Sequence, residues 1–393
     1  MKYLILIYFV LSAFLSSLAY AELGMNDISV LIPLPKNELE MKSLLSAQNK
    51  ISDHSTIELM PENVFKFLPV LIPTINQLQL YNNNLKVIAL RFDPCFTEGF
   101  SPTACQSQIR LVWQPVIFKS DHNGNLKPST IDAAIHSFYN LDAIKWKALM
   151  SEINLISVTD IKLPLQIHPT ILSQGLDGIY WNQLKKIILK YANKDNLIRA
   201  TAMTVRMDRV WGFQGVDLKD NQWTAIEIPT LKILNRPEAK VTSQAFFLEP
   251  ESLLDLTEFK GGASLLEINN QSWFRLLSDS KKYGETQTEN EIKVALGLAY
   301  NLENPKKHNP GTIDCVSCHL AQTIRLWGSE KFKTWDFNQL FKSEIYQNKN
   351  IDLKNTSVNP ANTNRARAFG YFDDEPIISQ RIINETAQIL YPQ

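Results

Sequence analysis

Two thiols and an imidazole stand close together near the C-terminal end of the chain, within the stretch DCVSCH that begins at Asp314. Cys315 and Cys318 are three residues apart, and His319 follows directly. Residues three and four positions apart share one face of a helix, so on a helix all three side chains would point the same way. Thiolates and imidazoles bind metal ions, and cysteines also form covalent bonds through sulfur. This stretch carries the strongest chemical signal in the chain.

The residues around this stretch predict a helix from Cys315 to Trp327. Asp314 is a favourable N-cap, and Gly328 is a favourable residue for ending a helix. A repeat of about 3.6 residues per turn gives such a helix two faces. One face carries the two thiols, the imidazole and Gln322. The other face, which is expected to pack against the rest of the protein, carries Val316, Leu320, Ile324 and Trp327.

The pattern of Cys, two residues, Cys and His resembles the haem-attachment motif of c-type cytochromes. The resemblance covers the motif and its helix, and it implies one covalently bound haem c. Cys315 and Cys318 would bind its vinyl groups, and His319 would be an axial ligand of the iron. It further implies an exported monohaem cytochrome-like protein that exchanges electrons with a redox partner protein. Two other uses of the residues stay open: a zinc site, with His308 as a further ligand, and a disulfide or redox dithiol.

The second axial position of the iron is the main question that the resemblance raises. Small c-type cytochromes commonly supply a Met downstream of the motif, but no Met or His follows His319. We predict His308 as the distal ligand, because it lies seven residues before Cys315 on a loop with two prolines and a glycine. If no side chain fills this position, the alternative is a haem enzyme or sensor with an open iron site for peroxide or a gas.

The remaining histidines and the methionines nearest the motif show no spacing typical of ligands. Met203 and Met207 lie in a strand-like run and are expected in the core. The histidines expected to be structural or surface residues are His54, His122, His136 and His168.

Residues 1–21 have the pattern of a cleavable signal peptide. Lys2 is followed by an apolar run and then by Ala19-Tyr20-Ala21, so cleavage is expected after Ala21. The apolar run is shorter than the roughly 20 residues that span a bilayer, so no transmembrane anchor is expected after cleavage. The mature protein is therefore expected in the periplasm or outside the cell, the compartment in which haem c is attached.

The other two cysteines and the overall charge narrow the choice of function further. Cys95 and Cys105 close a short loop and are expected to form a disulfide in an oxidising compartment. The chain has 40 Lys and Arg against 40 Asp and Glu, so no excess of charge favours nucleic acid as a partner.

The predicted fold class is α+β. An N-terminal mixed domain with an antiparallel sheet is expected over residues 22–260, and a mainly helical, haem-bearing region over residues 263–393. The boundary is placed at the double glycine of Gly261 and Gly262. Strands are expected at 28–32, 87–92, 109–113, 200–207, 211–216, 223–228 and 240–247, and helices at 130–139, 178–191, 273–277, 290–302, 336–346 and 377–390.

Overall fold

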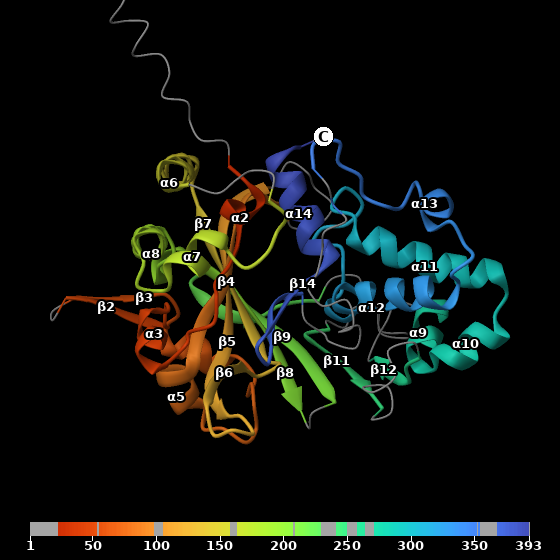
Figure 1. The fold of residues 1–393 in the computed structure, drawn as a ribbon, viewed down its shortest axis with the longest axis horizontal. Coiled ribbons are helices and arrows are strands. Elements are labelled where there is room, and N and C mark those ends of the chain that lie inside the picture. The colour runs from red at the N-terminus through yellow and green to blue at the C-terminus, as the bar shows by residue number, and fades with distance from the viewer. Residues whose placement is uncertain are drawn as a thin grey trace, which may run out of the picture.

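The structure is a computed structural model, and it describes residues 23–52, 55–97, 105–157, 163–206, 209–228, 241–249, 258–263, 271–351, 353 and 368–392. The expected signal peptide lies outside the described residues. The architecture is α+β, as predicted: strands predominate in the first two thirds of the chain and helices in the last third (Figure 1).

Ten strands of the described residues form one sheet, and each neighbouring pair is antiparallel. Each of the seven predicted strands overlaps a strand of this sheet. In the order of the sheet, its main strands are β1 (Ser29–Leu31), β4 (Leu85–Thr97), β5 (Cys105–Ser120), β7 (Ala134–Leu141), β8 (Leu197–Arg206), β9 (Val210–Lys219), β11 (Ser243–Leu248) and β12 (Gly261–Ala263), with β6 (Leu126–Thr130) beside β5 and β10 (Gln222–Ala225) beside β9.

One face of the sheet is covered by helices from the first half of the chain (Figure 1). Successive side chains of a strand point to opposite faces, so Leu111 and Trp113 of β5 lie in this core while Val112 lies on the other side. The helices that pack here are α4 (Glu62–Phe67), α6 (Ala143–Ile156), α7 (Pro169–Gln174) and α8 (Ile179–Tyr191). The shorter segments α3 (Glu38–Ser43) and α5 (Gln77–Gln79) and the hairpin of β2 (Gln48–Ser52) and β3 (Ser55–Glu58) complete this half. The short helix α2 (Met25–Ile28) instead packs with α14 (Gln380–Leu390) on the other side of the sheet.

The second face carries two separate apolar clusters. One joins Met203, Trp211 and Phe213 of β8 and β9 to the helices of the last third of the chain. The other joins Val112 to the C-terminal helix and a small hairpin. The first cluster includes α9 (Gln271–Ser278), α10 (Ser280–Thr286), α11 (Glu289–Glu303) and α12 (Cys315–Lys331); the second includes β13 (Phe369–Phe372), β14 (Glu375–Ile378) and α14 (Gln380–Leu390).

The predicted domain boundary is not a linker in the structure. Gly261 and Gly262 belong to β12, which pairs with β11 at the end of the large sheet. A side chain on Gly262 would meet the ring of Phe247 on β11, so the glycine permits this close pairing. The C-terminal helices also share a core with strands β8, β9 and β11. The helical region and the strand-rich region are therefore not separate domains, because the C-terminal helices pack directly on strands of the large sheet.

The predicted helix 130–139 is wrong, because this stretch ends β6 and forms most of β7. Ser129 follows a turn and could cap the start of a helix, but it lies in β6, which pairs with β5 as a hairpin. β7 pairs with β5 on one side and with β8 on the other. This pairing with two neighbouring strands determines the local structure, although Ser129 is a favourable N-cap for a helix. Side chains of β7 consequently alternate between the two faces of the sheet.

Two C-terminal helices also differ from their predicted bounds. The helix predicted at 377–390 begins at Gln380, with Ser379 as N-cap, because Glu375–Ile378 pair as β14 with β13. Pro376 is tolerated there in an edge strand, where its missing N–H breaks no ladder. Of the helix predicted at 336–346, only α13 (Phe337–Leu340) is helical, and turns follow it.

The predicted disulfide between Cys95 and Cys105 is confirmed. It joins the ends of β4 and β5 across their hairpin, with the two Cα atoms 4.7 Å apart. That separation lies within the range of roughly 4.4–6.8 Å seen for disulfides.

Replacing Cys95 and Cys105 together with Ser is expected to destabilise the oxidised protein by about 2–3 kcal/mol, since the bond closes a short loop in the unfolded chain. The measurement is denaturant unfolding of the wild type and the double variant, with the m-value monitored. Equal midpoints, or free thiols at both positions in the exported wild-type protein, would contradict this prediction.

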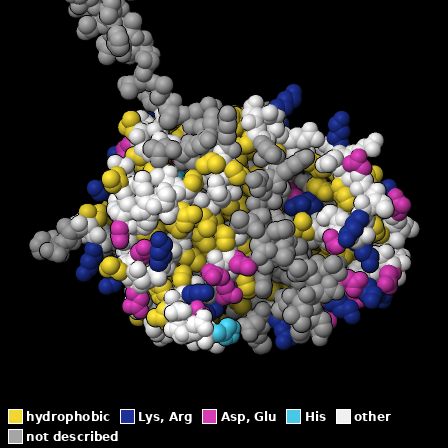
Figure 2. All heavy atoms as spheres, in the orientation of Figure 1, with side chains coloured by type: hydrophobic (Ala, Val, Ile, Leu, Met, Phe, Trp, Pro, Cys, Tyr) yellow, Lys and Arg dark blue, Asp and Glu magenta, His cyan; other side chains and the backbone are white. Residues whose placement is uncertain are grey.

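Among the described helices, none has both the length and the apolar composition needed to span a bilayer. On the face shown in Figure 2, basic and acidic side chains are interspersed among apolar ones. No broad surface of one charge is visible among the described residues on that face.

Gly328 does not end the motif helix, contrary to prediction. α12 continues to Lys331, and Gly328 lies inside it and is buried against α11. A Cβ atom at this position would lie 2.3 Å from Leu296 Cδ2, and Leu296 is itself fully buried. The glycine is therefore required for the close approach of the two helices rather than for a cap.

Gly328→Ala is expected to destabilise the protein by about 1–3 kcal/mol, because overpacking at Leu296 outweighs the gain of about 1 kcal/mol in helix propensity. Gly297→Ala on the neighbouring helix is the matched control. A Cβ there would meet its nearest atom at 3.7 Å, which is ordinary contact. Thermal unfolding should give shifts of opposite sign for the two variants; a stabilised Gly328→Ala would refute the packing argument.

Candidate functional site

The N-terminus of the motif helix is fixed by two polar side chains. Asp314 is the N-cap, as predicted, and its Oδ1 accepts a hydrogen bond from the Ser317 amide at 2.9 Å. Gln244 of β11 adds a second clamp: its Nε2 donates to Asp314 Oδ1 at 2.8 Å, and its Oε1 accepts from the Val316 amide at 2.9 Å. All of these contacts are buried, so the start of α12 is tied firmly to the sheet.

The two predicted faces of the motif helix are present. Cys315, Cys318 and His319 are partly exposed, and the two thiols are not joined to each other. Gln322 on the same face accepts a hydrogen bond from the Gln380 amide at 2.8 Å, which connects α12 to the start of α14. The opposite face is buried in the apolar cluster and consists of Val316, Leu320, Ile324 and Trp327.

A partly open cavity of about 300 Å³ lies between this helix, the second face of the sheet and α14. Both motif cysteines and His319 line it. The cavity lies between the two apolar clusters of the second face, and its walls combine apolar side chains of both clusters with charged ones. A larger depression of about 510 Å³ lies elsewhere, beside α6 and the end of α14, and is lined mostly by apolar side chains.

The floor of the cavity is made by alternate residues of three neighbouring strands. His136 of β7 lies in the middle, between Val112 of β5 and Thr201 of β8. One cross-strand row away, Met203 pairs with Phe213, whose ring lies 4.9 Å from that of His319. His136 and Met203 thus face the same cavity as the motif.

The row on the other side of His136 is cationic. Arg110 of β5 and Arg199 of β8 flank Phe138, with their guanidinium carbons 4.8 and 6.0 Å from the centre of its ring. Arg199 also forms a two-pronged ion pair with Asp217 of β9, in which its Nη2 donates at 2.9 Å. Arg110 and Arg199 both line the cavity.

The wall opposite the motif is a buried ion-pair network on α14. Arg381 donates from Nε to Glu385 at 2.7 Å, and Arg91 of β4 pairs with the other oxygen of the same carboxylate. Arg91 also pairs with Asp93 at 3.0 Å. The two neighbouring arginines hold the pKa of the Glu385 carboxyl far below its usual range, despite the opposing effect of burial. Arg381 and Glu385 therefore form a fixed pair of charges in the cavity wall.

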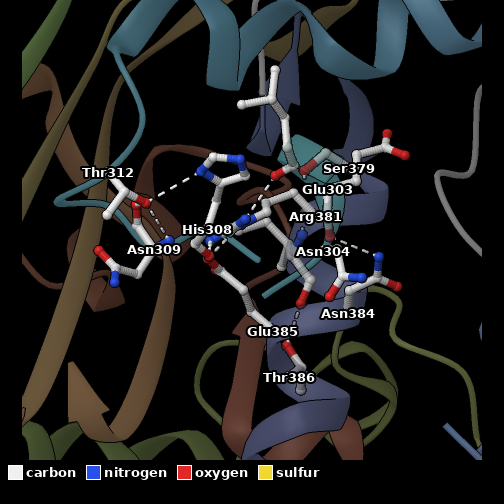
Figure 3. A network of polar contacts seen from close by, with 12 residues as sticks. Glu303, Asn304, His308, Asn309, Thr312, Ser379, Arg381, Asn384, Glu385 and Thr386 are labelled. Carbon is white, nitrogen blue, oxygen red and sulfur yellow. Dashed lines mark hydrogen bonds and ion pairs between the residues drawn. The ribbon is translucent and has the colours of Figure 1, made fainter. Parts of the chain in front are cut away.

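Arg381 is also held in place by two backbone carbonyls (Figure 3). Its Nη1 donates to the Leu302 carbonyl at 2.6 Å and its Nη2 to the His308 carbonyl at 2.8 Å. Nearby, Asn384 donates to the Glu303 carbonyl at 2.9 Å. These bonds fasten α14 to the end of α11 and to the loop that leads into the motif helix.

His308, the predicted distal ligand, does not line the cavity that contains the motif. Its ring lies 3.3 Å from the Thr312 hydroxyl, measured from Nδ1, and it borders a smaller cavity of about 110 Å³ on the far side of Arg381 and Glu385. Burial and the nearby charge of Arg381 lower the pKa of its imidazole. The structure therefore brings Cys315, Cys318 and His319 together and places His308 apart from them.

The two motif thiols border the cavity and are disfavoured as thiolates near neutral pH. Burial raises the pKa of Cys318 to about 11 and raises that of Cys315 further, with Asp314 adding to the second effect. Redox dithiols need a thiolate near neutral pH. This observation disfavours the redox-dithiol alternative.

The zinc alternative also finds no support in the described part of the chain. No three His, Cys, Asp or Glu side chains are placed there as a group that could hold a metal ion. A haem iron needs only one such protein ligand besides its porphyrin, so the same observation does not weigh on the haem hypothesis.

Several cavity residues escaped the sequence analysis. The sequence predicts His136 on a helix and shows no ligand spacing for it. In the structure His136 lies on β7, and the alternation of side chains along that strand brings it to the cavity. Arg110 and Arg381 lie far apart in the chain, and only the tertiary fold brings both to the wall of the same cavity. The alternating residues Ala134, His136 and Phe138 are a pattern from which a strand with these side chains on one face could be predicted. No sequence pattern indicates the charged wall formed by Arg381 and Glu385.

Comparison with protein-family models, with curated proteins and with solved structures gave no match to this chain.

Proposed function

We propose that the chain is an exported monohaem c-type protein that carries out electron transfer. The observation that carries the proposal is the cavity beside the motif: both thiols and the imidazole open into one space enclosed by a sheet and two helices. A random Cys-x-x-Cys-His match would have no reason to border such a space. The confirmed disulfide is compatible with the exported location that haem attachment requires.

The residues of the cavity suit a porphyrin. Cys315 and Cys318 would form the thioether bonds and His319 would ligate the iron, while Phe138, Met203 and Phe213 offer apolar surface for the ring. When bound, haem supplies a one-electron redox centre whose potential depends on its axial ligands and on burial. A cavity of about 300 Å³ is at the small end for ligand pockets, so an edge of the macrocycle would remain at the opening.

The chain's own residues would orient the haem and shield it in the cavity. The Asp314–Gln244 clamp fixes the helix that carries the motif. The partly exposed face of His136 points into the same space and makes it our choice for the second axial ligand, in place of His308. An open-site enzyme or sensor is the second candidate, favoured if neither His136 nor any other side chain ligates the iron.

The test is expression with an export signal in a host that attaches haem c. The purified protein should retain a haem stain on a denaturing gel and show the sharp reduced α-band of haem c. A colourless protein, or one loaded stoichiometrically with zinc from the same host, would end the proposal.

A further inference from the structure

Lys86 of β4 is a buried lysine that forms no ion pair with a described carboxylate. Only 7% of its surface is exposed, and its Nζ lies 2.7 Å from Ser46 Oγ, its one hydrogen-bond partner among the described residues. Burial alone lowers the pKa of its ammonium group to about 8, and no neighbouring charge contributes to that shift. Because a charged amine is costly to bury, a large share of Lys86 is a neutral amine at slightly alkaline pH.

The polar side chain opposite Lys86 in the sheet is already used by the backbone. Gln114 of β5 is the residue paired with Lys86. Its Nε2 donates to the Ile131 and Tyr371 carbonyls at 3.2 and 2.9 Å, and its Oε1 accepts from the Tyr371 amide at 2.7 Å. Both ends of the Gln114 amide are thus taken up, which leaves the Ser46 hydroxyl as the partner of the lysine.

Ser46 lies between α3 and β2, and its backbone is fixed on both sides. Its amide donates to Asn49 Oδ1 at 3.0 Å, and Asn49 Nδ2 donates back to its carbonyl at 2.6 Å. The carbonyl of Leu45 accepts from the Val87 amide at 3.0 Å, which ties this segment to the strand beside Lys86. Ser46 is partly exposed, so a solute can reach the serine while the amine next to it is shielded from water.

A serine hydroxyl beside a neutral lysine amine is an arrangement suited to acyl transfer. The hydroxyl is a weak nucleophile by itself, and a base at about 2.6–3.2 Å can take its proton during the attack. The distance between Ser46 Oγ and Lys86 Nζ lies in that range. Lysines act as such bases where burial favours the neutral amine.

We propose that Ser46 and Lys86 are a catalytic dyad that hydrolyses small carboxylic esters. Ser46 Oγ attacks the ester carbonyl and passes its proton to Lys86 Nζ, which gives that proton to the departing alcohol. Water then attacks the acyl-serine, Lys86 returns a proton to Oγ, and the acid is released. One ester and one water are consumed. The substrate is expected to be small, because neither residue lines the three cavities described above, and the reaction is independent of the haem.

The experiment treats the purified full-length protein with a biotinylated fluorophosphonate, which labels activated serines, and locates the label by mass spectrometry. We expect Ser46 to be labelled and p-nitrophenyl acetate to be hydrolysed, and we expect Ser46→Ala to remove the label and the catalysed hydrolysis. Lys86→Met should slow each reaction at least about 100-fold, the lower end of what a general base contributes. Two matched controls should leave both rates unchanged: Ser43→Ala, at a nearby serine bonded to Asp177, and Lys42→Met, at an exposed lysine.

The pH profile distinguishes an activated serine from an ordinary one. Because only the neutral amine accepts a proton, labelling of Ser46 should rise with pH up to about 8 and level off above it. An unactivated hydroxyl would continue to gain in rate as hydroxide increases. The profile is measured on the wild type, so it decides the question even if thermal unfolding shows that Lys86→Met is not folded. Absence of label on Ser46 in the wild type, an equal rate in folded Lys86→Met, or a profile without a plateau would each overturn the dyad.

Discussion

Replacing Cys315 and Cys318 together with Ala is expected to remove all covalently bound haem from the exported protein. A thioether bond survives denaturation, whereas a haem held only by His319 dissociates when the chain unfolds. The double variant should therefore lose the haem stain on a denaturing gel completely. Each single variant should keep a weaker stain through the remaining thioether. Both cysteines border the cavity and are free of a disulfide, so either can react.

The other pair of cysteines is the matched control for this experiment. Cys95→Ser with Cys105→Ser removes the same number of sulfurs but acts at a hairpin end. It should lower stability and leave the stain intact. Loss of the stain in this control, at equal protein amount and with the protein folded, would show that the stain reports folding rather than attachment. A stain that persists in the Cys315 and Cys318 double variant would contradict covalent attachment outright.

Local chemistry was predictable from the sequence where it depends on neighbouring residues. The N-cap at Asp314, the apolar face of the motif helix and the hairpin closed by Cys95 and Cys105 all follow from spacing along the chain. In each case the residues that determine the structure lie within a few positions of one another. The antiparallel sheet was likewise indicated by runs of β-branched and aromatic residues.

What escaped prediction depends on contacts between distant segments. Gly328 reads as a helix end, yet its role is set by Leu296 on another helix. The stretch after Ser129 reads as a helix start, yet pairing on both sides makes it a strand and turns His136 toward the cavity. The ion pair of Glu385 with Arg91 joins α14 to β4, and the hydrogen bond from Arg381 to the His308 carbonyl joins α14 to the loop before the motif. No local sequence pattern indicates either contact.

Because residues 134–141 form strand β7 rather than a helix, His136 lines the cavity and replaces His308 as the expected second ligand of the iron. The expected spin state and ligand binding of the iron follow from this change. His308 lies on the far side of Arg381 and Glu385, in a different cavity. His136 shares its cavity with His319 and lies beside the row that contains Phe213, on which the His319 ring packs. A neutral imidazole is a strong iron ligand near pH 7. The wild-type protein is therefore expected to be six-coordinate and low-spin.

His136→Ala should convert the absorption spectrum completely from low-spin to high-spin and should allow carbon monoxide or cyanide to bind readily, because it opens one axial position while His319 still holds the other. Two controls separate the competing ligands: His308→Ala and Met203→Leu should both leave the low-spin spectrum unchanged. Conversion by His308→Ala would restore the loop histidine as ligand, and conversion by Met203→Leu would assign the position to the thioether. A wild-type spectrum that is already high-spin, and unaffected by all three changes, would show an open iron site and move the function from electron transfer to peroxide chemistry or gas sensing.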